Sequence, residues 1–371
     1  MGSVPAPRPE GARFYRTGQG RLCSRLDIRG RRASLVRMEL TEDELVAAIR
    51  KVLSGEAPGV IIGVGDDAAV VEGGRGSQVL TTDMLVEGVH FDRAATSPRD
   101  LGYKAIVVNV SDIAAMAASP RFALASLGLP DEVDAAWVME LFGGMREAGG
   151  EYALSLVGGD LNRAPHVVVS VTVLGEVAPG LEVTRAGARP GDRVVVTGSL
   201  GAAAGGLALS RGHPSRVGSA FGSSWGRELL RALFRPVARV GEAQTLAQAG
   251  ATAMMDLSDG LTKDLSRLCA ESGVGARIEL ASVPVSEALP PAAEVLRFDP
   301  LELALSGGED YELLAAVRSS AVDLARDELK ERYGVALTDI GAIIEEGLVA
   351  VDPGGRERPL EPKGWDHFAG S

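Results

Sequence analysis

Acidic residues recur at the ends of apolar runs in this chain, mostly beside glycine. Five segments have this form: Gly65-Asp66-Asp67, Thr81-Thr82-Asp83, Gly158-Gly159-Asp160, Asp256-Leu257-Ser258-Asp259-Gly260 and Gly307-Gly308-Glu309-Asp310. Each has a structural explanation when taken singly, because Asp before Gly is a common turn and Asp256 or Asp259 would cap a helix beginning at Leu261. Their joint recurrence at strand ends, where α/β sheets build sites, favours a shared chemical role.

A sixth carboxylate, Asp112, lies inside a strongly apolar helical segment. Burying even an uncharged polar group without a partner costs roughly 2–7 kcal/mol, so this carboxylate needs one. The partner is either an Arg or Lys from elsewhere in the chain or a metal ion. Lys104 is eight residues away on the same helix, too far for a direct i,i+4 pair.

Carboxylates accompanied by the hydroxyls of Thr81, Thr82 and Ser258 are a ligand set for hard cations. Mg²⁺ takes oxygen ligands, keeps several waters and commonly bridges to substrate phosphates. A zinc site would call for convergent Cys or His, and no ligand spacing occurs among His90, His166, His213 and His367. The residues therefore predict an enzyme that handles phosphates through Mg²⁺.

Charge and missing motifs exclude several other classes of protein. The chain contains no G-x-x-x-x-G-K-[ST] loop and no protein-kinase motif set. Its net charge of −12 makes nucleic acid an improbable partner. Residues 1–37 hold nine Arg and two acids, so the remaining 334 residues carry −19. An acidic body that binds phosphates needs cations as intermediaries.

The length of 371 residues is suited to two domains, and the pattern predicts an α+β unit in each half. Residues 1–37 are expected to be a disordered basic extension or leader, and Thr41 with Glu44 forms a capping box. The first half is expected to contain strands 60–62, 69–71, 79–82, 123–128, 154–157 and 167–177 and helices 100–118 and 135–148. A domain boundary is expected at Pro179-Gly180.

The second half is expected to alternate strands and helices in the same way. Its predicted strands are 193–197, 253–256, 277–280, 311–317 and 335–343, and its predicted helices are 226–233, 241–248 and 261–272. A helix should open after Gly198-Ser-Leu-Gly201, and the Gly- and Ser-rich residues 212–224 are expected to form a mobile loop. With no signal peptide, no membrane span and only Cys23 and Cys269, a cytoplasmic location is expected.

An ordered set of motifs, spread from about Met38 to Phe368, resembles the thiamine-monophosphate kinase family. This family belongs with aminoimidazole ribonucleotide synthetase and selenide, water dikinase in one superfamily. The motifs are Gly63-Val-Gly-Asp-Asp-Ala-Ala69, Thr81-Thr-Asp-Met-Leu-Val-Glu-Gly-Val-His-Phe91, Leu101-Gly-Tyr-Lys-Ala105, Asn109-Val-Ser-Asp-Ile-Ala-Ala-Met116, Gly158-Gly-Asp160, Asp256-Leu-Ser-Asp-Gly-Leu261, Leu305-Ser-Gly-Gly-Glu-Asp-Tyr-Glu-Leu313 and Gly364-Trp-Asp-His-Phe368.

The resemblance implies a two-domain aminoimidazole ribonucleotide synthetase-like fold. Residues 38–178 would form a sheet-rich domain that binds ATP and Mg²⁺ and makes a homodimer, and residues 179–371 an α/β C-terminal domain. The implied activity is ATP-dependent phosphorylation of thiamine monophosphate to thiamine diphosphate, the last step of thiamine diphosphate biosynthesis. Several Mg²⁺ ions would take part, with no nucleic acid, no membrane and no residue acting as a covalent or acid–base catalyst.

The resemblance also implies roles for individual residues. The implied Mg²⁺ ligands are Asp66, Thr82, Asp83, Asp112, Asp160 and Asp256, with Thr81 and Asp259 as further candidates. The implied ATP contacts are Gly159, Asp160, Arg185 and Ser258, and the implied thiamine-phosphate contacts are His90, Glu309 and Trp365. Leu161-Asn162 departs from the family, because many relatives have hydroxyl residues there.

Two other functions remain open from the sequence. The chain could be a superfamily enzyme with another acceptor, although Gly364-Trp-Asp-His-Phe368 and Val89-His90-Phe91 argue against this. It could also be a catalytically silent sensor of thiamine phosphates, although such a sensor would not need the complete carboxylate set.

Overall fold

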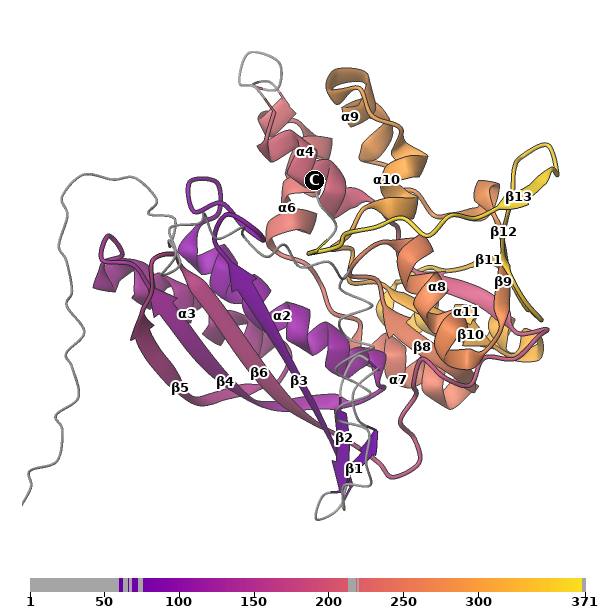
Figure 1. The fold of residues 1–371 in the computed structure, drawn as a ribbon, viewed down its shortest axis with the longest axis horizontal. Helices are drawn as coiled ribbons and strands as arrows, with labels where there is room; N and C mark the ends of the chain where they lie inside the picture. The colour runs from indigo at the N-terminus through magenta and orange to yellow at the C-terminus, as the bar shows by residue number, and fades with distance from the viewer. Residues whose placement is uncertain are drawn as a thin grey trace, which may run out of the picture. The chain divides into compact units, whose positions relative to one another are not determined.

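The computed structural model describes residues 60–62, 66, 69–72, 76–212, 218 and 220–368 (Figure 1). The predicted extension at residues 1–37 and the capping box at Thr41 lie outside these residues. The described chain contains two β-sheets with helices packed on them.

The first sheet has six strands in the order β1-β2-β3-β6-β4-β5. All neighbours are antiparallel except β4 and β5, which are parallel. The side chains of β6 alternate, with Val169, Val171 and Val173 buried and those between them half-buried, as expected for a sheet with one covered face. The strands are β1 (Val60–Ile62), β2 (Ala69–Glu72), β3 (Ser77–Val86), β4 (Ser119–Leu129), β5 (Ser155–Arg163) and β6 (Val168–Val177).

Two helices, α2 (Pro98–Ala115) and α3 (Ala135–Glu151), cover that face. Helix α2 begins where Ser97 accepts the backbone N–H of Asp100, with Pro98 at its first turn. It is buried on nearly all sides, because it contacts β3, β6 and α3 as well as α7 and β8 of the second half.

The second sheet has seven strands in the order β13-β12-β9-β11-β7-β10-β8, and only β12 and β9 are parallel. The strands are β7 (Arg193–Thr197), β8 (Ala251–Asp256), β9 (Gly275–Glu279), β10 (Leu313–Val317), β11 (Leu337–Ile344), β12 (Leu348–Val351) and β13 (Glu357–Pro359). The helices are α4 (Ala202–Ser210), α6 (Ser224–Phe234), α7 (Val240–Ala249), α8 (Leu261–Ser272), α9 (Leu289–Leu296), α10 (Pro300–Ser306) and α11 (Val322–Tyr333).

These elements confirm the predicted α+β class, while some predicted boundaries are wrong. Gly159 and Asp160 lie inside β5, paired with β4, rather than after a strand that ends at residue 157. Asp83 likewise lies within β3. Strand β10 begins at Leu313 rather than at residue 311, because Tyr311 has a left-handed φ of 51° that no strand accommodates.

Other elements were not predicted at all: α9, α10, α11, β12 and β13. Helices α9 and α10 span only eight and seven residues, too short for a clear helical period. Of the predicted mobile loop, residues 220–222 form a 3₁₀ turn and Ser224 begins α6, while residues 213–217 and 219 lie outside the described residues. None of the helices among the described residues has the length and apolar character needed to cross a bilayer.

Glycine allows α2 and α3 to approach closely. A Cβ atom added to Gly102 would lie 1.9 Å from the carbonyl oxygen of Leu141, and one added to Gly144 would lie 1.8 Å from that of Arg99. No side chain fits at either position without moving one helix away from the other.

We therefore expect Gly102→Ala to destabilise the protein by about 1–3 kcal/mol, because the methyl group pushes α3 away from α2. Gly150→Ala is the matched control: it lies in α3 with nothing within 4 Å of its added Cβ, and should stabilise by about 0.5–1 kcal/mol. Urea unfolding followed by circular dichroism measures both. Equal midpoints for the two variants would contradict the close packing.

Candidate active site

Strand β3 and helix α2 bring three of the predicted site residues together. The Thr81 hydroxyl donates a hydrogen bond of 2.6 Å to Oδ2 of Asp112. The backbone N–H of Asp83 donates to Oδ1 of Asn109, one turn earlier on α2, over 3.0 Å. Thr81 and Asp83 share a strand face because they are two residues apart. Asp112 therefore meets a hydroxyl of β3 across the interface between the helix and the strand.

Asp256, at the end of β8, joins the same group from the second sheet. It is 1% exposed, and its Oδ2 accepts a hydrogen bond of 2.6 Å from the hydroxyl of Ser111. Ser111 precedes Asp112 on α2, so one helix carries contacts to the acids of both sheets. The position of Asp256 as the last residue of β8 confirms the expectation that an acid ends this strand.

The segment from Gly307 to Glu312 lies beside Asp256. The N–H of Glu309 donates to the carbonyl of Ser258 over 2.8 Å, and that of Tyr311 to the carbonyl of Leu257 over 2.9 Å. The Glu309 carboxylate reaches Nζ of Lys104 at 2.6 Å. Lys104 is 5% exposed and also donates to the carbonyl of Leu233.

The acids of both sheets lie close enough to act on one phenol. Burial raises the pKa of Tyr311, and the charges of Glu309, Asp83, Asp256 and Asp112 raise it further. These carboxylates come from four separate segments of the chain, yet all of them act electrostatically on one buried side chain.

His90 and Trp365 meet through a third ring, that of His367. The His90 and His367 rings lie 4.9 Å apart, and the His367 ring lies 5.6 Å from Trp365, edge to face. His90 Nδ1 accepts the N–H of Val86 over 3.0 Å, which requires the neutral ring. Burial lowers the pKa of His90, and the neighbouring His367 lowers it further.

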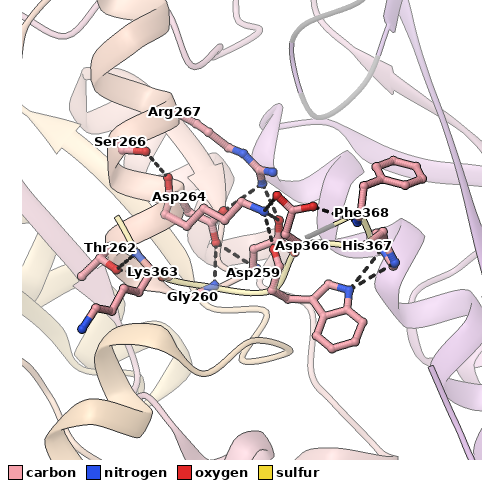
Figure 2. A network of polar contacts seen from close by, with 12 residues as sticks. Asp259, Gly260, Thr262, Asp264, Ser266, Arg267, Lys363, Asp366, His367 and Phe368 are labelled. Atoms are coloured by element: carbon pink, nitrogen blue, oxygen red, sulfur yellow. Dashed lines mark hydrogen bonds and ion pairs between the residues drawn. The ribbon is translucent and has the colours of Figure 1, made fainter. Parts of the chain in front are cut away.

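The C-terminal segment that carries Trp365 is tied to helix α8 (Figure 2). Thr262 exchanges two hydrogen bonds with the backbone of Lys363, over 2.8 and 3.0 Å. Lys263 donates to the backbone carbonyl of Trp365. The backbone N–H of Trp365 in turn donates to the carbonyl of Asp259 over 3.0 Å. Trp365 itself is 47% exposed.

The Asp259 side chain lies in a network of basic partners. It pairs with Arg267 at 2.7 Å and with Lys263 at 3.4 Å. Neither Asp256 nor Asp259 caps α8, whose N-cap is Gly260. Instead Asp264 accepts the N–H groups of Asp259 and Gly260, and burial with the Asp259 charge raises its pKa to about 7.

Other predicted residues lie elsewhere. The Asp66 carboxylate accepts the backbone N–H of Arg185 at 3.0 Å, so these two residues are neighbours. Thr82 lies on the opposite face of β3 from Thr81, where its hydroxyl donates to the carbonyl of Val171. Asp160 bonds Asn162 on the exposed edge strand β5.

Gly159 has a structural role in that strand. A Cβ atom there would lie 1.8 Å from the carbonyl oxygen of Ala125, so β4 and β5 require glycine at this position. Among the residues that the structure describes, no three Asp, Glu, His or Cys side chains form a ready-made metal cage. The metal-ligand assignments stay predictions.

A cavity of about 190 Å³ adjoins Glu309. Its lining combines three arginines, Arg231, Arg235 and Arg239, with four acids that include Glu309 and Glu312. Arg239 and Glu312 form a paired fork at 2.5 and 2.7 Å. The cavity is thus close to neutral, unlike the group of acids around Tyr311.

Comparisons with known proteins identify the family of the chain. Residues 65–177 match the AIR synthase related protein N-terminal domain, and residues 189–352 match its C-terminal domain. The chain is 36% identical to the thiamine-monophosphate kinase of Aquifex aeolicus over 332 residues, which is 89% of this chain and 99% of that protein. It is 39% identical to the enzyme of Escherichia coli K12 over 316 residues, or 84% and 93%.

The chain belongs to the thiamine-monophosphate kinase family. The fold agrees, since the solved structure of AaThiL complexed with AMPPCP and TMP superposes with a TM-score of 0.75. That structure is 35% identical, and the match covers 89% of this chain and 98% of that one. The resemblance predicted from the motifs is confirmed.

Sequence reasoning missed several residues that hold the site of this family member together. They are Lys104, Asn109, Ser111, Tyr311 and His367. The argument made for Asp112 applies equally to Lys104, a charged residue in an apolar helix, and could have singled it out. Tyr311 stands in the quoted motif at residues 305–313, but its residue type indicated no role, because an aromatic residue before a strand is ordinarily part of the core.

We expect Lys104→Met to destabilise the protein by about 1–3 kcal/mol, because Glu309 and the Leu233 carbonyl lose their partner. Arg121→Met is the matched control, since its pair with Glu176 is half-exposed on both sides and should contribute about 0–1 kcal/mol. Thermal unfolding measures both. The pair would be unimportant if Lys104→Met and Arg121→Met had the same effect, or if adding Glu309→Gln to Lys104→Met restored no stability.

Proposed function

We propose that this chain transfers the γ-phosphoryl group of ATP to thiamine monophosphate, which yields thiamine diphosphate and ADP. The observation that carries the proposal is the match of 35% identity over 89% of the chain to AaThiL, a structure that holds AMPPCP and TMP. The named relatives, at 36% and 39% identity, are thiamine-monophosphate kinases. Because ATP supplies the phosphoryl group, it is a co-substrate.

The chemistry asks little of the protein beyond position and charge. An oxygen of the acceptor phosphate attacks the γ-phosphorus, a new P–O bond forms, and the bond to the β-phosphate oxygen breaks as ADP leaves. The attacking oxygen is already ionised near neutral pH, so no general base is needed. Holding two anions in line is the main requirement.

The donor set fits magnesium. Asp83, Asp112 and Asp256 offer oxygen ligands alone, and all three act electrostatically on the Tyr311 phenol. Mg²⁺ commonly takes one or two carboxylates and completes its shell with water and substrate phosphates, so it needs no complete protein cage. We propose these three as ligands, with Asp66, Thr81, Thr82, Asp160 and Asp259 as further candidates for several ions. When bound, Mg²⁺ would neutralise and align the phosphates.

The acceptor and nucleotide have separate candidate contacts. We propose that Trp365 stacks on a ring of the thiamine phosphate, since its indole is half-exposed and held by the C-terminal segment. His90 and Glu309 would contact the same acceptor. Gly159, Asp160, Arg185 and Ser258 remain proposals for ATP.

Product analysis by mass spectrometry tests the function. Protein would be mixed with ATP, Mg²⁺ and thiamine monophosphate, with EDTA and free thiamine as controls. We expect thiamine diphosphate and ADP, lost with EDTA and absent with free thiamine. ATP consumption without thiamine diphosphate would indicate a superfamily enzyme with another acceptor, and tight product binding without turnover would indicate a sensor.

We expect Asp83→Asn and Asp112→Asn to lower turnover at least about a hundredfold and to raise the Mg²⁺ concentration needed for half-maximal rate. The fold should survive, because amide and carboxylate have the same shape. Asp131→Asn is the matched control, since this exposed acid pairs only with Arg163 on the surface. Near-full turnover in either site variant would remove that residue from the ligand set.

We also propose that the chain is a homodimer formed through the face of the first sheet that lies opposite α2 and α3. Leu80, Leu174 and Phe122 lie in register across β3, β6 and β4 on this face. Met84 and Leu124 on the same face are 54% and 49% exposed. An apolar sheet face of this kind is typical of an interface between copies.

Leu124→Asp should therefore convert the dimer into a monomer, because it places a charge in the apolar face. Leu324→Asp is the matched control, since Leu324 is 66% exposed on helix α11. Light scattering after size exclusion gives the mass of each. A wild type that elutes as a monomer, or a Leu124→Asp variant that stays dimeric, would contradict this interface.

We propose a cytoplasmic location, consistent with a buried Cys269 thiol.

A further inference from the structure

Tyr311 is a core side chain that buries a polar hydroxyl together with its ring. It is 7% exposed, and its hydroxyl makes no hydrogen bond with any residue in the described part of the chain. Buried hydroxyls in folded proteins are nearly always hydrogen-bonded, because an unpaired donor gives up water without compensation. A donor kept in this state needs a reason outside core packing.

The backbone conformation around Tyr311 also indicates a functional role. Both Glu309 and Tyr311 have left-handed φ values, of 67° and 51°, which side chains other than glycine rarely adopt. Hydrogen bonds from Glu309 and Tyr311 to Ser258 and Leu257 enforce this path, and Asp310 anchors it on the N–H of Gly201 over 2.9 Å. Strain of this kind persists where surrounding contacts enforce it, and it is concentrated at functional sites.

The surroundings show which group the phenol would meet. The N–H of Tyr311 bonds the carbonyl of Leu257, which follows Asp256, and Glu309 is two residues earlier, so Tyr311 lies beside the acidic group. Asp83 and Asp112 also act on its phenol electrostatically. Carboxylates are acceptors alone, and a bare anion would be repelled by them. Phosphates that enter together with cations bring further acceptor oxygens, and a neutral phenol can donate to these without adding charge.

We propose that the Tyr311 hydroxyl donates a hydrogen bond to a phosphate oxygen of a bound substrate. The inference rests on the proposed function, and it adds a substrate contact to the kinase site. The phosphate belongs either to the nucleotide or to thiamine monophosphate, and separate ligand measurements distinguish the two. The hydroxyl, which has no hydrogen-bond partner among the described residues, would gain one when the ligand is bound.

The test is Tyr311→Phe, which removes one oxygen atom. Without ligand, this variant should be as stable as the wild type or more so, because the lost hydroxyl had no partner. Its turnover should fall about 10- to 100-fold. The thermal stabilisation given by AMPPCP with Mg²⁺, or by thiamine monophosphate with Mg²⁺, should shrink for whichever ligand carries the contacted phosphate.

Tyr103→Phe is the matched control. Tyr103 is equally buried, but its hydroxyl bonds the Glu151 carboxylate over 2.9 Å at the far end of α2. This variant should lose stability without ligand and keep its turnover and its ligand-induced shifts. Tyr311→Phe should therefore lose activity and keep its stability, whereas Tyr103→Phe should lose stability and keep its activity.

Three results would overturn the proposal. Tyr311→Phe could match the wild type in turnover, in KM and in both ligand shifts. It could lose stability without ligand as Tyr103→Phe does, which would make its hydroxyl structural. A wild type with neither product nor any ligand shift would overturn this proposal together with the proposed function, and that outcome is recognisable before any variant is made.

Discussion

The hydrogen bond between Ser111 and Asp256 joins helix α2, which packs on the first sheet, to the end of strand β8 in the second sheet. Helix α2 can make this contact because it is buried on nearly all sides and still carries polar residues, among them Lys104, Asn109 and Ser111. Lys104 and Ser111, two turns apart, face the second sheet, while Asn109 and Asp112 face β3. A single helix thus sets the spacing between acids that lie far apart in the sequence.

Electrostatics explains why so many contacts are needed. Carboxylates placed near one another repel, and each would favour solvent if it were not held. Here two hydroxyls and one lysine hold three of them: Thr81 holds Asp112, Ser111 holds Asp256 and Lys104 holds Glu309. Carboxylates gathered in this way favour cations, and anions that enter among them are repelled unless cations accompany them.

The second sheet contributes rigidity to the segment from Gly307 to Glu312. Asp310 accepts the N–H of Gly201 at the start of α4, and Glu312 is held by Thr197 and by the guanidinium of Arg239. These anchors on both sides of Tyr311 keep a strained backbone in place. The C-terminal segment is held in a similar way, since Thr262 and Lys263 of α8 fix the backbone that carries Trp365.

The sequence by itself determined the α+β class, most strands and helices of the first half, and the family, because these follow from local periodicity and from ordered motifs. It also singled out Asp83, Asp112, Asp256 and Glu309, since charge in apolar surroundings is visible in the chain. Tertiary structure alone decided their partners. Thr81 meets Asp112 across 31 positions and Ser111 meets Asp256 across 145, and no local pattern encodes such distances. The left-handed turn at Tyr311 likewise follows from contacts with Ser258 and Leu257, which only the folded chain brings alongside.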